Sequence, residues 1–211
     1  MEAGSTQVLQ QLASGSFAGL VSACEELELA MQDELPETPS PEQIAHMDLL
    51  YAAHLLAYLL EGRLSAARFL WKRTPASLQS QPQLAAAHST FVASWRRQFP
   101  EFFSLLQTST WDARLQPLAA QVITSSREQL LDQISEAYKV ITLDSTGRML
   151  GLDSVSARAA CEQRGWAVDA ADNVLPVPKK TMGDDLMSMG SEQLGKLAEY
   201  VAYLEQPQCR I

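Results

Sequence analysis

Residues 59–73 read LLEGRLSAARFLWKR, and this stretch shows most clearly the local pattern that recurs along much of the chain. Apolar side chains recur at helical spacing from about Glu42 to Leu60, and Gly62 follows directly, as glycine often does just past a helix end. The next helix begins at once and should stop near Thr74, because Pro75 disfavours a helical backbone at the residue before it. The stretch therefore predicts a helical hairpin with a tight turn.

The cations and aromatic rings of RFLWKR (68–73) allow a second interpretation, because rings and cations together can bind single-stranded nucleic acid. On a helix, however, Trp71 shares a face with Leu64 and Ala67, whereas the cations project to other sides. A stacking surface would need both kinds of side chain on one face. We therefore expect Trp71 to pack in the core and the cations to be solvated.

The hairpin pattern recurs along residues 1–111. The second helix of each pair begins with apolar residues spaced i, i+3, i+7, which is the pattern of a degenerate helical-hairpin repeat. This predicts a mainly α fold that starts with a solenoid of tetratricopeptide type. A single long helix should follow over residues 112–141. The repeated sets are Phe17, Leu20 and Cys24; Leu64, Ala67 and Trp71; and Phe99, Phe102 and Leu106.

The pattern changes over residues 142–178. A short helix, a turn at Gly151 and a second helix ending at Gly165 precede two β runs, Trp166–Val168 and Val174–Val177. Helix, helix and β-hairpin is the order of a winged-helix module. A polar linker at 179–190 and an amphipathic helix at 191–205 complete the predicted organisation.

The charge of the chain is unevenly distributed. Its 211 residues carry a formal net charge of −9, yet residues 63–100 hold six cations and no acid. Residues 141–180 hold five cations and five acids, so the winged-helix segment is neutral and poorly suited to bind DNA. We expect its second β run to present an unpaired edge that binds another protein by strand addition. The residues of this candidate site are Val174, Leu175 and Val177.

Residues that could carry out chemistry are few and scattered. His46, His54 and His88 do not have the i, i+4 spacing of a helical zinc site, and there is no Cys-x-x-Cys pair. No phosphate-binding glycine loop follows a predicted strand. We therefore expect no catalytic residues, no metal and no cofactor. We also expect neither a secretory leader nor a membrane span.

The last predicted helix has a narrow apolar seam. Leu194, Leu197, Val201 and Leu204 are spaced 3, 4 and 3 residues apart, which is typical of a coiled coil. An isolated helix of this length is marginal in water, so we expect the seam to bind a partner.

Four segments together resemble the PCI-domain family, and within it the family of COP-nine signalosome subunit eight. They are SAARFLWKRTPASL, LLDQISEAYKVITLDSTGRMLGL, CEQRGWAVDAADNVLPV and LAEYVAYLE. The small PCI subunits of the proteasome lid and of translation initiation factor three share the architecture and remain alternatives, followed by a winged-helix nucleic-acid binder.

The resemblance implies a non-catalytic scaffold in the nucleus and cytoplasm. The signalosome removes Nedd8 from cullin-RING ubiquitin ligases through an isopeptidase on a different subunit. The resemblance further implies a hetero-oligomer with other PCI subunits, joined through wing edges and a bundle of C-terminal helices, and no nucleic-acid or membrane partner.

Overall fold

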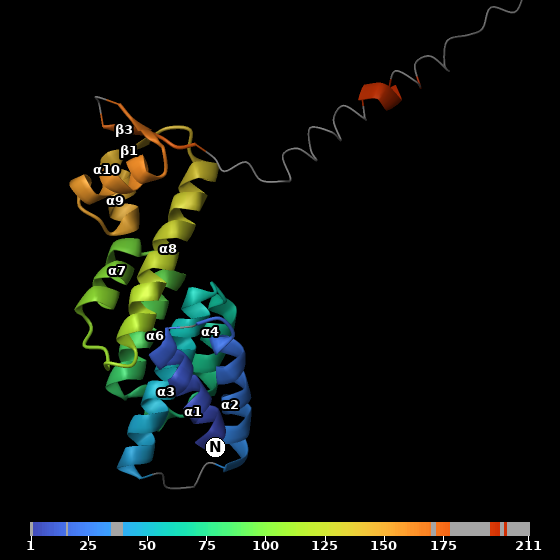
Figure 1. The fold of residues 1–211 in the computed structure, drawn as a ribbon, viewed down its shortest axis with the longest axis vertical. Coiled ribbons are helices and arrows are strands. Elements are labelled where there is room, and N and C mark those ends of the chain that lie inside the picture. Colours follow the sequence, from blue (N-terminus) through green and yellow to red (C-terminus); the bar gives the residue numbers. More distant parts are fainter. Residues whose placement is uncertain are drawn as a thin grey trace, which may run out of the picture. The chain divides into compact units, whose positions relative to one another are not determined.

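The structure is a computed structural model that describes residues 2–15, 17–34, 40–169, 172–177, 195–198 and 201. The chain forms two compact units, residues 1–176 and 177–211. The first unit is mainly helical (Figure 1). Its helices are α1 Glu2–Ser14, α2 Leu20–Glu34, α3 Pro41–Leu60, α4 Leu64–Arg73, α5 Ala76–Gln79, α6 Pro82–Trp95, α7 Phe99–Thr108, α8 Gln116–Ala137, α9 Leu143–Leu150 and α10 Ser154–Gln163; its strands are β1 Ile141–Thr142, β2 Ala167–Val168 and β3 Asn173–Leu175.

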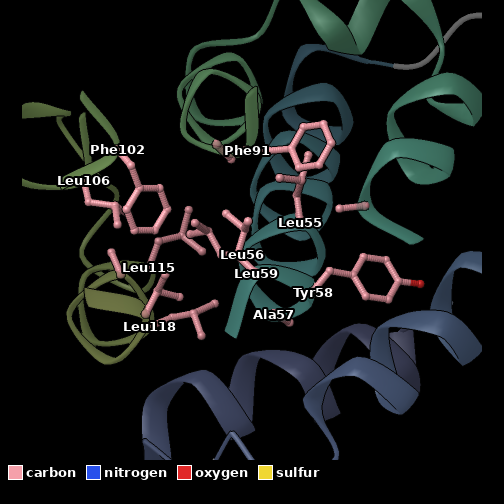
Figure 2. Close-up of a cluster of buried hydrophobic side chains, with 14 of the residues drawn as sticks. Leu55, Leu56, Ala57, Tyr58, Leu59, Phe91, Phe102, Leu106, Leu115 and Leu118 are labelled. Carbon is pink, nitrogen blue, oxygen red and sulfur yellow. The ribbon is translucent and has the colours of Figure 1, made fainter. Parts of the chain in front are cut away.

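Helix α3 is the centre of the hydrophobic core. Every residue from Met47 to Leu59 is buried, so this part of the helix is covered on all sides. Helices α2, α4, α6 and α8 all contact it. Figure 2 shows Leu56 and Leu59 pointing toward Leu115 and Leu118, while Leu55 points toward α6. A helix that is apolar all round needs this enclosure.

The turn between α3 and α4 has the predicted form. Gly62 has φ 71°, a left-handed backbone conformation that glycine adopts without steric cost. The N–H of Arg63 donates to the carbonyl oxygen of Tyr58 at 2.9 Å and closes the end of α3. Helix α4 ends at Arg73, and Thr74 is extended before Pro75. Both predicted helix ends are confirmed.

Asp48 of α3 caps helix α6 from another part of the chain. Its carboxylate is almost fully buried and accepts the backbone N–H groups of Leu84 at 2.7 Å and of Gln83 at 3.2 Å. These donors lie in the first turn of α6, where backbone N–H groups have no partner within the helix. Burial raises the pKa of Asp48, although the two hydrogen bonds act in the opposite direction.

A partly buried ion pair joins α2 to α4, since Glu28 is buried and Arg73 is 46% exposed. Arg73 donates from Nε to Oε1 of Glu28 at 2.8 Å and from Nη2 to Oε2 at 2.7 Å. Two parallel hydrogen bonds of this kind hold both side chains in one geometry. Among the cations of RFLWKR, Arg73 therefore binds an acid on one side while the rest of its side chain stays in solvent.

Trp71 packs against the edge of the hydrophobic core and is only partly buried. Its side chain is half-buried, and its ring stacks on that of His88 with centroids 3.6 Å apart. Arg68 and Lys72 line the same hollow. The expected packing of Trp71 on the core is therefore seen in part, whereas its expected separation from the cations is wrong. The fully buried residues of this helix are Ala67 and Leu70.

The long helix ends earlier than predicted, at Ala137 rather than near residue 141. Ile141 and Thr142 form β1, which pairs antiparallel with β3. Thr142 also caps α9, since its side chain accepts the N–H of Ser145. The backbone at 141–142 therefore serves the sheet and the next helix, which prevents α8 from continuing.

Close contacts attach α9 to the preceding helices. Gly151 ends α9 with φ 60°, and a Cβ atom there would lie 2.6 Å from the Cβ of Phe103 in α7. Arg127 of α8 donates to the carbonyl oxygen of Leu150 at 3.1 Å, and its guanidinium carbon lies 5.1 Å from the centre of the Phe103 ring. Gly151 is therefore required both by the turn and by the approach of α7.

Within the described residues, no helix is long and apolar enough to cross a membrane.

His54 makes the stability of the first unit sensitive to acid. It is buried in α3, its Nδ1 lies 3.9 Å from Oε2 of Glu28, and its Nε2 has no hydrogen-bond partner among the described residues. Burial is the main cause that lowers its pKa from 6.5 to about 3, with Arg73 and Arg63 acting in the same direction. Folding therefore requires the neutral ring.

We predict that the unfolding free energy falls as the pH drops below 6.5, by up to about 1.4 kcal/mol per pH unit, because the unfolded state binds the proton first. The loss should continue toward the folded-state pKa of about 3. Urea denaturation at several pH values should show a shallower dependence for His54→Phe, which cannot titrate. Equal slopes for the two proteins would contradict this assignment.

Candidate protein-binding surfaces

The small sheet has the order β1-β3-β2, so β3 is its central strand. Val174 of β3 is opposite Ile141 on one side and Val168 on the other. The expectation that the run beginning at Val174 presents an unpaired edge is wrong for the residues of β3. Strand β1, which the sequence pattern did not predict, pairs with that edge, and the outer edges of the sheet belong to β1 and β2.

Side chains near β3 differ sharply in exposure. Val174 is 0% exposed and belongs to the core, so its side chain cannot be reached by a partner. Leu175 is 43% exposed, and Val177, which follows the strand, is 58% exposed. Alternation of this kind follows from the period of two in a strand. Of the three candidate residues, Leu175 and Val177 are therefore available for contact.

Two cations of this segment, Arg158 in α10 and Arg164 just after it, are engaged within the first unit. Arg158 donates to Asp172 at 2.5 Å, which ties α10 to the turn before β3. Arg164, just after α10, pairs with Asp132 of α8 and also donates to the carbonyl oxygen of Glu128 at 3.2 Å. These cations stabilise the packing of α10, and this helix offers little free charge to a phosphate backbone.

The C-terminal helical segment exposes its described apolar residues. Residues 195–198 are helical, Leu197 is 59% exposed, and Val201 is 50% exposed. A Cβ atom at Gly195 would meet nothing within 4 Å. The other two members of the predicted seam, Leu194 and Leu204, lie outside the described residues.

Groups that could perform chemistry lie apart in the described part of the chain. There, no three His, Cys, Asp or Glu side chains are placed to hold a metal ion. Cys24 and Cys161 are buried, and burial raises the pKa of both thiols, that of Cys24 to about 12. His54 and His88 are occupied by packing, against Tyr58 and Trp71.

Sequence comparisons identify relatives along most of the chain. The profile of the CSN8/PSMD8/EIF3K family matches residues 45–184. The chain belongs to the CSN8/PSMD8/EIF3K family. The matched residues include most of the central helix α3, Gly151 and the residues of all three strands.

Three relatives from frogs and a plant share one name. The chain is 31% identical over 192 residues to COP9 signalosome complex subunit 8 of Xenopus tropicalis, and the alignment covers 90% of this chain and 94% of the relative. The protein of the same name from Xenopus laevis is 30% identical, with 91% and 94% covered. That from Arabidopsis thaliana is 28% identical, with 94% and 97% covered.

Two adjacent residues of β3 should differ sharply in their effect on the unfolding free energy. Val174→Asp places a charge in the core and should lower the unfolding free energy by about 3 kcal/mol or more. Leu175→Asp places the same charge on an exposed position and should cost about 1 kcal/mol or less. Thermal and urea denaturation of the two variants measure the difference. Similar losses would mean that the two side chains are not on opposite faces of the sheet.

Proposed function

We propose that the chain is a non-catalytic scaffold subunit of a COP9 signalosome complex, in which a separate isopeptidase subunit removes Nedd8 from cullin-RING ubiquitin ligases. The observation that carries the proposal is the alignment of frog and plant signalosome subunits 8 with this chain over nine tenths of its length or more. A scaffold role is also in keeping with a site made of apolar contact residues. The proposal includes residence in both nucleus and cytoplasm.

The proposed architecture is a solenoid of helical hairpins that leads into a winged helix. Contacts between consecutive helices, α1 with α2, α3 with α4 and α6 with α7, support the first part. The order of α9, α10 and the hairpin β2–β3, with β1 as a third strand, supports the second. The proposed domains are 1–111, the connecting helix 112–141, the winged helix 142–178, the linker 179–190 and the bundle helix 191–205.

Two surfaces would join this chain to other PCI subunits. The first is the sheet, where the outer edges of β1 and β2 and the exposed side chain of Leu175 are available. Val177, the first residue of the second unit, is also exposed and is proposed as a contact residue in its own right. The second is the C-terminal segment, in which Leu197 and Val201 would enter a shared helical bundle. Exposed apolar side chains on a narrow helical seam gain most by burial against other helices. Duplex DNA is a poorer candidate partner, because Arg158 and Arg164 are already engaged in ion pairs.

A matched pair of variants tests the bundle. Leu197→Glu introduces a charge on the seam, whereas Gly195→Glu introduces the same charge about 200° around the helix, where a side chain meets nothing within 4 Å. Each tagged full-length chain is expressed in cells of its own source, purified, and its partners are identified and quantified by mass spectrometry. The wild type and Gly195→Glu should retain signalosome subunits in equal ratio. Leu197→Glu should retain about tenfold less, a loss of the size expected when one apolar contact is replaced by a charge.

The melting temperature of each isolated chain provides the control. It should be nearly the same in all three proteins, because Leu197 is exposed. Normal assembly of Leu197→Glu would remove this helix from the proposed interface. Recovery of proteasome-lid or initiation-factor subunits with the wild type would replace the signalosome assignment itself.

A further inference from the structure

A hollow between α4 and α6 combines aromatic rings with cations. It has a volume of about 220 Å³. Phe91 is buried at its base, and the stacked rings of Trp71 and His88 line it. Trp95 is 47% exposed and has its ring centre 6.0 Å from that of Phe91. The rings on α6 are spaced i, i+3 and i+7, so one face of the helix carries them all.

Two cations of α4 lie at this hollow. The guanidinium carbon of Arg68 is 5.6 Å from the centre of the Trp95 ring, and the Nζ atom of Lys72 is 5.9 Å from the centre of the Phe69 ring. Both side chains line the hollow. Such positions over aromatic faces hold a cation in place while leaving it accessible.

Two other cations of α4 and its N-terminal end are already paired. Arg63 lies 3.0 Å from Glu25, and Arg73 lies 2.7 Å from Glu28, both on α2. In contrast, no described carboxylate forms an ion pair with Arg68 or Lys72, and residues 63–100 contain no acid at all. The helix therefore uses one pair of cations for its own packing and presents the other pair outward.

A partner that covers the hollow must match both features. Burying Arg68 and Lys72 without a counter-charge would cost free energy, so the partner needs carboxylates. The aromatic lining favours an aromatic side chain, which packs well against rings in offset or edge-to-face geometry. We propose that the hollow binds an acidic segment of another protein, which places one aromatic side chain among Trp71, Phe91 and Trp95 and carboxylates beside Arg68 and Lys72.

Single-stranded nucleic acid fits the same hollow less well. The rings of Trp71 and His88 are stacked on each other, so these two faces are closed to a base. Binding of a strand to two cations releases few counterions, and so gains little of the electrostatic free energy on which nucleic-acid affinity depends. A short acidic peptide needs neither a second stacking face nor an extended basic path.

Fluorescence anisotropy of the isolated full chain tests the proposal without depending on the signalosome assignment. Three fluorescein-labelled probes are compared: a peptide of Asp and Glu with one central Phe, the same peptide with Ser in place of Phe, and an oligothymidylate about 12 nucleotides long. The Phe peptide should bind saturably, with a Kd below about 1 mM, and the Ser peptide at least about fivefold more weakly.

Matched charge variants locate the site. Lys72→Glu should weaken the Phe peptide about tenfold, whereas Lys139→Glu, an equal change at another exposed lysine, should weaken it less than about twofold. Trp95→Ala should also weaken it, and circular dichroism should show that all variants keep their helical content. Equal effects of Lys72→Glu and Lys139→Glu, no saturable binding of the Phe peptide, or tighter binding of oligothymidylate would each overturn the proposal.

Discussion

The enclosure of α3 is the constraint on which the first unit depends. From Met47 to Leu59 no residue of this helix is left to solvent, so four other helices must be in place for it to be stable. Burial on all sides would contribute little if the polar members of the helix had no partners. Asp48 is hydrogen-bonded to α6, and Tyr58 donates to Glu25 of α2 at 2.9 Å. Polar and apolar contacts of α3 therefore specify the same set of neighbours.

Local sequence signals predicted those elements whose ends are set by nearby residues. Gly62 and Pro75 mark the bounds of α4 because each acts on its own backbone or on that of its neighbour. The mainly helical class and the two helices around Gly151 followed in the same way from spacing and turn residues. The family resemblance rested on such short strings and is confirmed by the profile match.

Features that depend on distant residues could not be predicted in this way. Two residues at 141–142 become a strand only because β3, some thirty positions later, pairs with them, and this pairing also moves β3 from the edge to the centre. The burial of Trp71 depends on which face of α4 is turned toward α3. The spacing of the apolar residues of α4 does not fix this orientation. The ion pair of Arg73 could not be predicted either, because its partner Glu28 lies on α2, far away in the sequence. For the candidate site, the sequence identified apolar residues near the sheet but could not separate buried Val174 from exposed Leu175.

The cap that Asp48 provides for α6 has a consequence for how this protein opens. The amide protons of Gln83 and Leu84 are held by a carboxylate that is distant in sequence and belongs to the central helix. They can exchange with deuterium from the solvent only when α3 and α6 separate, whereas amides in the first turn of an ordinary exposed helix exchange quickly. These two positions therefore act as built-in reporters of the docking of α3 on α6. Their exchange rates would therefore measure how often α3 and α6 separate, even while the hydrogen bonds within each helix remain intact.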